Sequence, residues 1–338
     1  MAIDQPDPII SEAEADARLA AQRDDILATL AKADHRMLAR DFRASAAFYG
    51  AVGRLAGSGV AIDRSELLRA RDAAVWLENQ FGVHLREGLE RAGLGEGQRH
   101  PRFQKALEIM QGRRQRDPVF TRYPQLPSTY FHPDLPLVHF ADPTAYDWRA
   151  AVEAATPAIL AEAQGLLAAD GTFKPYLQQT SDRPQGDVHG LLENPDWSTH
   201  YLTDMGQPIP DRVARCSVSF HTLNDNAPLC RIGARAPSVM FSLLRPHSRI
   251  PAHTGMVNCR FVCHLPLIVP PGCGFRVGAE TREWRVGELL VFDDSVEHEA
   301  WNDSDADRLV LIFDVWRPEL SFEERHQIEA LFAVVDSY

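Results

Sequence analysis

The sequence contains no apolar run of about 18 residues, the length that a helix needs to span a membrane. Its first residues, Met1–Asp7, hold neither a basic stretch nor an apolar core, so we expect no secretory signal. The net charge is −12, and an acidic chain is a poor general binder of nucleic acid. We therefore expect a cytoplasmic protein whose partners include neither membranes nor nucleic acid. No pattern in the sequence indicates its oligomeric state.

Cysteine is scarce in this chain. There are five cysteines, an odd number, and all lie between Cys216 and Cys273. In a protein without an export signal we expect reduced thiols that pack as small hydrophobic side chains. Cys259 and Cys263 are four residues apart on an expected strand, so they share one face. This pair could bind zinc, but the spacing is weak evidence without a second pair of cysteines.

The composition is that of a soluble globular protein with one large or two moderate domains. The chain has 338 residues, of which 45% are hydrophobic and 24% charged. Before residue 120, apolar residues recur at helical spacing, Gly57–Gly59 separates two helices, and Asp63 can cap the next. We therefore expect a helical accessory region over residues 1–122 and a second domain over residues 123–338.

Part of the N-terminal region resembles a helical repeat. Ala39, Phe42, Phe48 and Ala51 partly fit a tetratricopeptide helix pair. Such arrays usually need three or more repeats, and only one unit is convincing, so we favour an ordinary helical bundle. Residues 91–122 carry eight Lys or Arg against three Asp or Glu. A solvated helix face explains this bias, and a patch for an acidic partner is the less favoured interpretation.

Short strands and tight turns dominate the second half of the chain. A helix is expected from about Trp148 to Leu167, and a closing helix over Phe322–Val335. Residues 185–210 are polar and rich in turns, and loops of this length are often lids or binding loops. The expected strands are Ser217–Leu223, Ser238–Leu244, Cys259–Ile268, Gly274–Val277, Glu288–Phe292 and Arg308–Trp316. This pattern predicts an α+β protein whose helical N-terminal region precedes a cupin-like jelly roll, that is, a double-stranded β-helix.

Three polar residues stand out among these strands. His253 precedes Thr254 and Gly255, His298 lies in an acidic turn-like segment, and Arg308 opens an apolar run. Two histidines and a carboxylate on a barrel are typical of oxygenases that bind Fe(II) with open positions. An arginine on a neighbouring strand can hold a carboxylate co-substrate through two parallel hydrogen bonds. Gly255 stands where such a site usually has its carboxylate.

Four segments resemble the aspartyl/asparaginyl β-hydroxylase family of 2-oxoglutarate-dependent oxygenases. They are Phe241–Pro246 (FSLLRP), His253–Arg260 (HTGMVNCR), Phe292–Trp301 (FDDSVEHEAW) and Phe313–Leu320 (FDVWRPEL). A weaker match begins near Pro127 and includes Arg215–Cys216, so the resemblance covers roughly Tyr123 to Phe322. Four segments in the right order and spacing are a strong signal, whereas a lone His-x-Gly would mean nothing. A missing carboxylate ligand is normal in that family, so Gly255 fits the resemblance.

The resemblance implies cofactors and roles for individual residues. His253 and His298 would be the metal ligands for Fe(II), and O₂ and 2-oxoglutarate would be co-substrates, with succinate and CO₂ as co-products. Arg308 would hold the distal carboxylate of 2-oxoglutarate, and it would be partly buried at the start of an apolar strand. Ser242 and His264 would contact the same co-substrate. An ordinary core histidine is the alternative for His264.

One position departs from the family pattern. Relatives have a second arginine two residues before the equivalent of His264, and here that position is Val262. The 2-oxoglutarate pocket is then either less cationic or supplemented by Arg260 or Arg245. Asp293 and Asp294 do not restore a third ligand in this interpretation, because they precede a turn and are expected to cap it.

The sequence therefore predicts an Fe(II)- and 2-oxoglutarate-dependent hydroxylase. Its substrate would be an aspartyl or asparaginyl residue of a peptide or protein, or a small amino-acid-like molecule. The alternative is a non-catalytic module of helical repeats and a cupin domain that binds a peptide. Acceptor specificity resides in loops without a readable motif.

Overall fold

We describe a computed structural model of the chain, which covers residues 6–169, 171–180, 183–184 and 190–338. Two compact units make up the chain: Met1–Gly93 with Gln178–Val188 and Ser337–Tyr338, and Leu94–Leu177 with His189–Asp336. Residues 1–5 at the N-terminus and residues 185–189 of the expected loop lie outside the described residues. In the described part of the chain, no helix is both long and apolar enough to cross a membrane.

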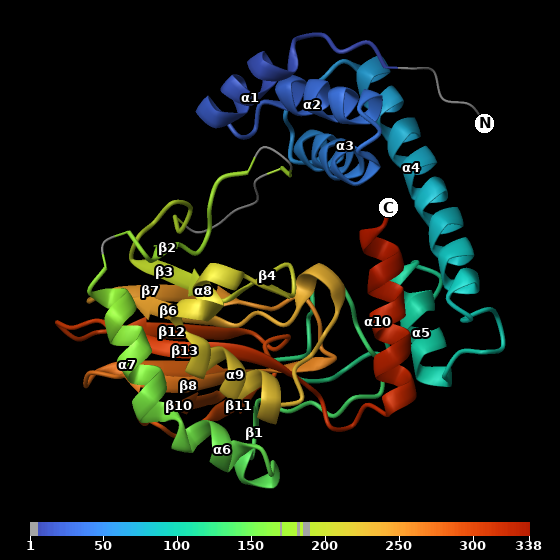
Figure 1. Cartoon of the computed structure of the whole chain (residues 1–338). Coiled ribbons are helices and arrows are strands. Elements are labelled where there is room, and N and C mark those ends of the chain that lie inside the picture. The colour runs from blue at the N-terminus through green and yellow to red at the C-terminus, as the bar shows by residue number, and fades with distance from the viewer. Residues whose placement is uncertain (1–5, 170, 181–182, 185–189) are drawn as a thin grey trace. The chain divides into compact units, whose positions relative to one another are not determined.

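The first unit is built mainly from four helices, labelled in Figure 1. They are α1 (Glu12–Ala21), α2 (Ile26–Leu38), α3 (Phe42–Gly57) and α4 (Arg64–Arg91). Asp25, Asp41 and Asp63 each accept a backbone N–H at the start of α2, α3 and α4, as an N-cap does. Leu30, Phe48 and other apolar side chains of these helices pack into one core. The tetratricopeptide likeness stays a prediction.

The second unit begins earlier than the boundary that we expected at residue 122. It includes α5 (Pro101–Met110), which buries Phe103 and Leu107 and packs against the closing helix α10 (Phe322–Asp336). Arg102 of α5 donates to the buried carboxylate of Glu324 at 2.7 Å. These contacts are long-range in sequence, so the sequence pattern around residues 94–122 did not indicate them.

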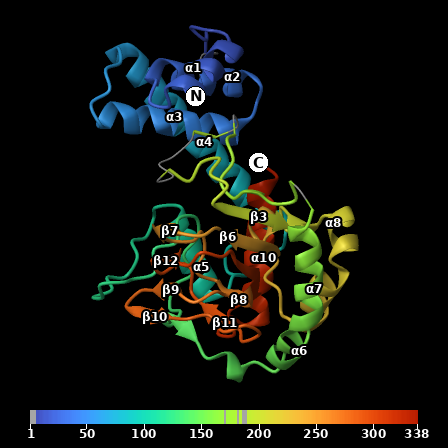
Figure 2. The ribbon, with the colours of Figure 1, turned by 90° about the vertical axis from the view of Figure 1, so that its left-hand side faces the viewer.

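Two antiparallel sheets form the second unit's core. The first contains β1 (Phe140–Ala141), β2 (Lys174–Pro175), β3 (Trp197–Tyr201), β6 (Met240–Leu244), β8 (Arg260–Ile268), β11 (Leu290–Phe292) and β13 (Arg308–Trp316), in the order β1-β11-β8-β13-β6-β3-β2. The second contains β7 (Ser248–His253), β9 (Cys273–Val277), β10 (Glu280–Arg282) and β12 (His298–Asn302), in the order β10-β9-β12-β7. Figure 2 shows the two sets side by side. Sheets made of such non-consecutive neighbours form the expected cupin-like jelly roll.

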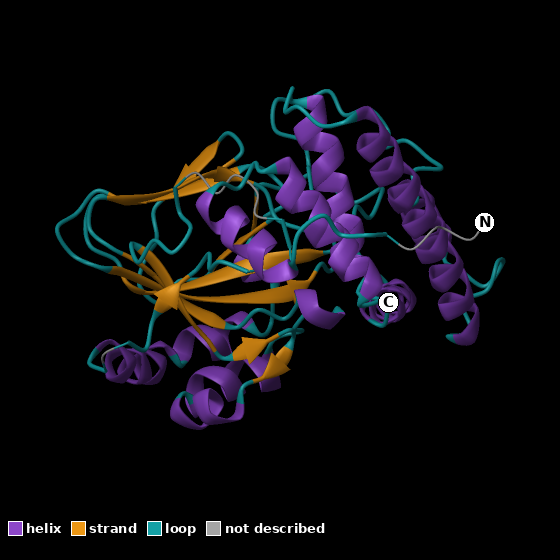
Figure 3. Ribbon diagram, turned by 90° about the horizontal axis from the view of Figure 1, so that it is seen from above, coloured by secondary structure: helices purple, strands orange, loops and turns teal. Residues whose placement is uncertain are grey.

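Helices cover the outer face of the larger sheet. They are α6 (Arg149–Ala154), α7 (Thr156–Leu167) and α9 (Ser217–Asn226), which is preceded by α8 (Pro210–Arg215). Figure 1 shows α7 and α9 in front of the strands, and Figure 3 shows helices beside the gathered strands. Short 3-10 turns occur at Pro143–Ala145 and Gly233–Arg235, and β4 (Thr203–Asp204) pairs with β5 (Gln207–Pro208).

The central strands β6, β8 and β13 are buried on both faces. The alternation of their side chains between the two faces of the sheet positions the site. On β13, the odd-numbered residues from Leu309 to Val315 join the core beneath the helices. The even-numbered Arg308, Val310, Ile312 and Asp314 therefore face the other sheet, because side chains alternate along a strand. The polar residues of these strands gather on that inner face.

Two local predictions were wrong. Ser217–Leu223 is not a strand but the start of α9, in which Ser219, Phe220 and Leu223 are buried at helical spacing. Short apolar runs do not distinguish these two structures by pattern alone. The helix expected over Trp148–Leu167 is broken at Ala155, and Pro157 lies in the first turn of the second segment, where a missing N–H is tolerated. The closing helix is confirmed as α10, and all five cysteines are buried and free.

Candidate functional site

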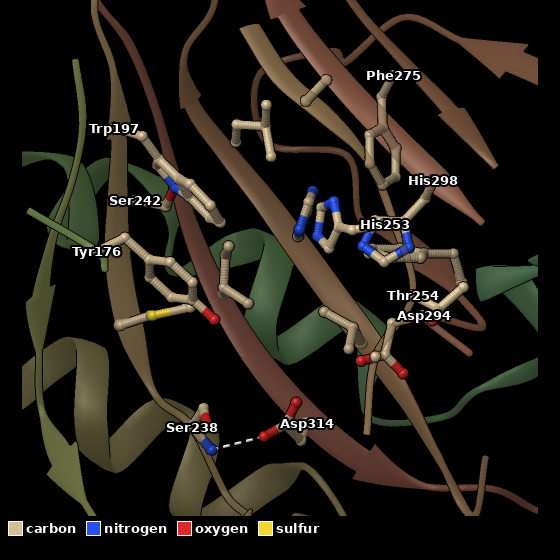
Figure 4. A pocket seen from close by; sticks show the side chains of 18 of the residues that line it. Tyr176, Trp197, Ser238, Ser242, His253, Thr254, Phe275, Asp294, His298 and Asp314 are labelled. Carbon is tan, nitrogen blue, oxygen red and sulfur yellow. Dashed lines mark hydrogen bonds between the residues drawn. The ribbon is translucent and has the colours of Figure 1, made fainter. Parts of the chain in front are cut away.

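A cavity of about 230 Å³ lies between the two sheets (Figure 4). It contains every site residue that the sequence predicted: His253, His298, Arg308, Ser242 and His264. The strand alternation described above brings the last three to its wall from β13, β6 and β8. Its remaining lining includes aromatic side chains and three charged ones, namely Tyr176, Trp197, Phe275, Phe292, Arg260, Asp294 and Asp314.

His253 and His298 face each other at one side of this cavity. They are register partners in the antiparallel pair β7 and β12, and their ring centroids are 4.1 Å apart. Nδ1 of His253 lies 2.7 Å from the carbonyl oxygen of Pro251, and Nδ1 of His298 lies 3.0 Å from that of Val296. A carbonyl only accepts, so both Nδ1 atoms carry the proton and both Nε2 atoms carry the lone pair. In each histidine, the hydrogen bond from Nδ1–H to the carbonyl fixes the orientation of the ring. Metal-binding histidines are usually held in this way.

The two histidines differ in exposure. His253 is exposed, whereas His298 is buried. Burial, reinforced by the neighbouring His253, lowers the pKa of His298 to about 3. The His298 imidazole is therefore neutral at physiological pH, which is the protonation state that a metal ligand requires. Within the described residues, no third His, Cys, Asp or Glu completes a group of three around the pair.

At Gly255, where such sites usually have a carboxylate residue, the space for a side chain is occupied by Asp294. A Cβ added at Gly255 would overlap the carboxylate of Asp294. The backbone N–H of Gly255 donates to the carbonyl oxygen of Asp294 at 2.6 Å, which holds the two segments together. Asp294 is thus more than the turn cap that we expected, whereas Asp293 does cap the turn by accepting from the N–H of Ser295 at 3.0 Å.

Arg308 is a buried cation without a counter-ion. Its side chain is 1% exposed, and no carboxylate in the described part of the chain pairs with it. The guanidinium lies over the ring of Trp284 at 4.8 Å and makes one long hydrogen bond of 3.4 Å to the carbonyl oxygen of Ser242, while Nε has no partner. Burial lowers the pKa of Arg308 to about 10. A desolvated cation of this kind is costly unless an anion joins it.

Two of the predicted residues present hydrogen-bonding groups beside Arg308. His264 accepts from the indole N–H of Trp284 through Nδ1 at 3.2 Å, and burial lowers its pKa well below the usual value. The neutral ring therefore carries its proton on Nε2, where it can donate. The Ser242 hydroxyl accepts from the indole N–H of Trp197 at 3.2 Å, which leaves the hydroxyl proton for another acceptor.

Neither arginine that could compensate for Val262 is available to do so. Arg245 lies at the surface, where it pairs with Asp307. Arg260 lines the cavity, but it is bound to two carboxylates, at 3.0 Å to Asp294 and 2.8 Å to Asp314. Of the two alternatives for the missing second arginine, the structure therefore favours a less cationic pocket over one supplemented by Arg260 or Arg245.

Sequence analysis missed several residues of the cavity. Trp197 lies on β3, inside the segment that we expected to be a loop, and it carries the hydrogen bond to Ser242. Asp314 lies six residues after Arg308 on β13, and Arg260 lies four residues before His264 on β8. These even separations place each pair on one strand face, so the period of two could have identified both residues.

The fold and the site define a cupin-like jelly-roll protein with a polar cavity between its sheets. A family model described as aspartyl/asparaginyl beta-hydroxylase matches residues 153–318. The resemblance to that family, which the four sequence segments indicated, is therefore confirmed over residues 153–318.

Several curated proteins are similar to part of this chain. The human aspartyl/asparaginyl beta-hydroxylase is 37% identical over 142 residues, which is 42% of this chain and 18% of that protein. The human aspartate beta-hydroxylase domain-containing protein 2 is 30% identical over 62% of this chain and 55% of that protein. An ornithine lipid ester-linked acyl 2-hydroxylase of Rhizobium tropici is 31% identical over 52% of this chain and 60% of that protein.

The similarity to these relatives covers only part of each protein. The chain spans from about a fifth to about three fifths of the length of these relatives. A solved oxidoreductase of the 2OG-Fe(II) oxygenase family from Burkholderia pseudomallei is 13% identical, with a TM-score of 0.25 over 35% of this chain and 66% of that one. So low a score adds nothing to the fold described above.

Proposed function

We propose that this protein is a hydroxylase that depends on Fe(II) and 2-oxoglutarate. The observation that carries the proposal is Arg308, a fully buried guanidinium with no counter-ion among the described residues, in the same cavity as a histidine pair. A structural arginine would have a carboxylate partner inside the protein. An arginine that awaits an anionic ligand would not, and the carboxylate of a co-substrate is such a ligand.

The residues present fit both groups. His253 and His298 would hold the metal through Nε2, because their Nδ1 atoms are committed to backbone carbonyls. Fe(II) accepts imidazole ligands, and a site with two protein ligands leaves positions for a bidentate co-substrate, O₂ and water. Arg308 would bind the distal carboxylate of 2-oxoglutarate, and the Ser242 hydroxyl and His264 Nε2–H would donate to the same molecule.

The reaction class follows from the cofactors. When bound, Fe(II) with O₂ and 2-oxoglutarate supplies the oxidising power for hydroxylating a C–H bond, with succinate and CO₂ as co-products. The protein's part is to orient the co-substrate and to exclude water, which the aromatic walls Trp197, Phe275 and Phe292 achieve around the cavity.

The proposed substrate is an aspartyl or asparaginyl residue, or a related small molecule. The family name supports the first choice, and the Rhizobium relative bears the name of a lipid hydroxylase, so acceptors differ between relatives. A free small molecule and a residue of a peptide both remain compatible with a cavity of about 230 Å³.

The test compares wild type, Arg308→Lys and Arg308→Met. Calorimetry measures the binding of 2-oxoglutarate to each protein, and a second assay measures succinate release with Fe(II). Removing one member of a buried charged pair costs about 3–5 kcal/mol, so Arg308→Met should weaken binding by roughly two or more orders of magnitude. Arg308→Lys should lie between, because lysine keeps the charge but loses the planar fork. Arg245→Ala, at the surface, is the control.

The same variants report on stability. Because no described residue is a counter-ion of Arg308, Arg308→Met should unfold at the same temperature as wild type or higher. An unchanged affinity for 2-oxoglutarate together with a large loss of stability would make Arg308 a structural residue. If wild type with Fe(II) released no succinate at all, the non-catalytic peptide-binding alternative would be favoured.

A further inference from the structure

A second charged group lines the cavity, and its charges do not balance. The guanidinium of Arg260 lies between the carboxylates of Asp294, at 3.0 Å, and Asp314, at 2.8 Å. All three side chains are at least nine-tenths buried. One cation thus faces two anions, whereas Arg308 faces none. We call these three residues the acidic cluster.

The acidic cluster also has unfilled hydrogen-bonding capacity. Oδ1 of Asp294 is buried and has no hydrogen-bond partner among the described residues, because Arg260 donates to Oδ2. Nε of Arg260 is likewise buried without a partner. A buried carboxylate oxygen normally has a donor, and each exception needs an explanation. Both residues line the cavity, so a ligand in the cavity can supply what the protein does not.

The acidic cluster lies at a different end of the cavity from the proposed 2-oxoglutarate site. Asp314 and Arg308 are six residues apart on one face of β13, and a strand rises about 3.3 Å per residue, so roughly 20 Å of strand separate them. Figure 4 shows Asp314 and Ser238 at one end, and Ser242 and Trp197 at the other. His253 and His298 lie on the facing side, within the same cavity.

We propose that the acidic cluster is the subsite for the molecule to be hydroxylated, and that it selects a substrate with a protonated amine, as a free amino acid has. The proposal rests on the proposed function for the position of 2-oxoglutarate. An ammonium group would donate to Oδ1 of Asp294 and bring the charges at this end to two against two. A hydroxyl or an acylated nitrogen in the same place would leave the excess negative charge buried.

The surroundings suit an ammonium group. Tyr176 lines the cavity near these residues and stacks on Trp197 with ring centroids 3.9 Å apart, which provides an aromatic wall that attracts cations. The backbone N–H of Ser238 donates to Asp314 at 2.6 Å and holds that carboxylate in place. Burial, opposed only in part by Arg260, raises the pKa of Asp314 to about 6.

The test compares ligands that differ only in the amine. The full chain is loaded with Mn(II) and 2-oxoglutarate without O₂, and calorimetry measures the binding of L-aspartate against L-malate, L-leucine against its 2-hydroxy analogue, and L-phenylalanine against phenyllactate. At least one amine should bind about tenfold or more tightly than its hydroxy partner, the strength of a charged hydrogen bond. In Asp294→Asn and Asp314→Asn this preference should fall to about twofold or less.

Both variants should fold, because each leaves Arg260 paired with one carboxylate. Asp305→Asn, a change at an exposed surface aspartate of the same unit, is the control and should keep the preference. The proposal is overturned if none of the three pairs shows the preference, or if it survives in both variants. Binding of 2-oxoglutarate itself is measured first. If it does not bind, the proposed function fails, and the amine preference is measured without it.

Discussion

The carboxylate of Asp294 occupies the space that a side chain at position 255 would need. Gly255 is therefore required by packing, independently of any role of that position toward a metal. The two residues are also joined by the hydrogen bond from the Gly255 N–H to the Asp294 carbonyl. Asp294 thus links two features of the cavity. It excludes a side chain at position 255, and it belongs to the acidic cluster.

The first prediction follows from this contact. Gly255→Ala should lower the free energy of unfolding by about 1–3 kcal/mol, because the new methyl group forces Asp294 away from Arg260. Urea unfolding of the purified proteins measures the change. Gly165→Ala is the matched control: it lies on α7 with open space around it, and should stabilise by roughly 0.5–1 kcal/mol. Equal stability of Gly255→Ala and wild type would show that Asp294 moves freely.

The second prediction concerns the histidine pair. His253→Ala and His298→Ala should each abolish Fe(II) binding in an anaerobic titration, because the described residues offer no third protein ligand beside the pair. His247→Ala serves as the control, since His247 precedes β7 and pairs with Asp305 at the surface. Retention of wild-type Fe(II) affinity in either variant would place the metal elsewhere.

The third prediction concerns acid stability. His132 is fully buried against Glu324, and burial lowers its pKa to about 4. The folded protein therefore binds fewer protons than the unfolded chain between pH 4 and 6.5, so stability falls as the pH falls through this window. At about 1.4 kcal/mol per pKa unit, the contribution of His132 should decrease by roughly 3 kcal/mol between pH 6.5 and pH 4.

The His132→Gln variant isolates that contribution. The difference in unfolding free energy between wild type and His132→Gln should shift in favour of the variant as the pH falls. Other buried groups, such as Asp293 and Asp314, titrate in both proteins and largely cancel in the difference. A difference that stays constant with pH would mean that His132 is protonated in the folded protein.

The fourth prediction concerns the domain boundary. A chain that begins at Leu94 should retain a cooperative thermal unfolding transition of the jelly roll, whereas a chain that begins at Tyr123 should unfold at a lower temperature. The second chain lacks α5, so it loses the buried Phe103 and Leu107 and leaves Glu324 without Arg102. Calorimetry of both chains measures this. Equal transition temperatures would support the boundary that the sequence suggested at residue 122.

Much of the fold was accessible from the sequence because it depends on local patterns. The Asp63 N-cap, helical spacing and a closing helix are properties of short segments, and all were confirmed in the structure. The strand predicted over Ser217–Leu223 was wrong because the prediction also relied on a local pattern. A seven-residue run contains too few periods to separate a helix from a strand. The placement of α5 depends on contacts with α10 more than 200 residues away, which no local pattern encodes.

The sequence by itself determined which residues gather at the cavity: His253, His298, Arg308, Ser242 and His264 lie on strands, and alternation along a strand turns them inward. Only the tertiary structure decided how their charges are matched. Over the part of the chain that is described, it left Arg308 without a counter-ion and set Arg260 between Asp294 and Asp314, which come from different strands and turns. Side-chain direction is a local property of the backbone, whereas the partner of a buried charge depends on which distant segments the fold brings beside it.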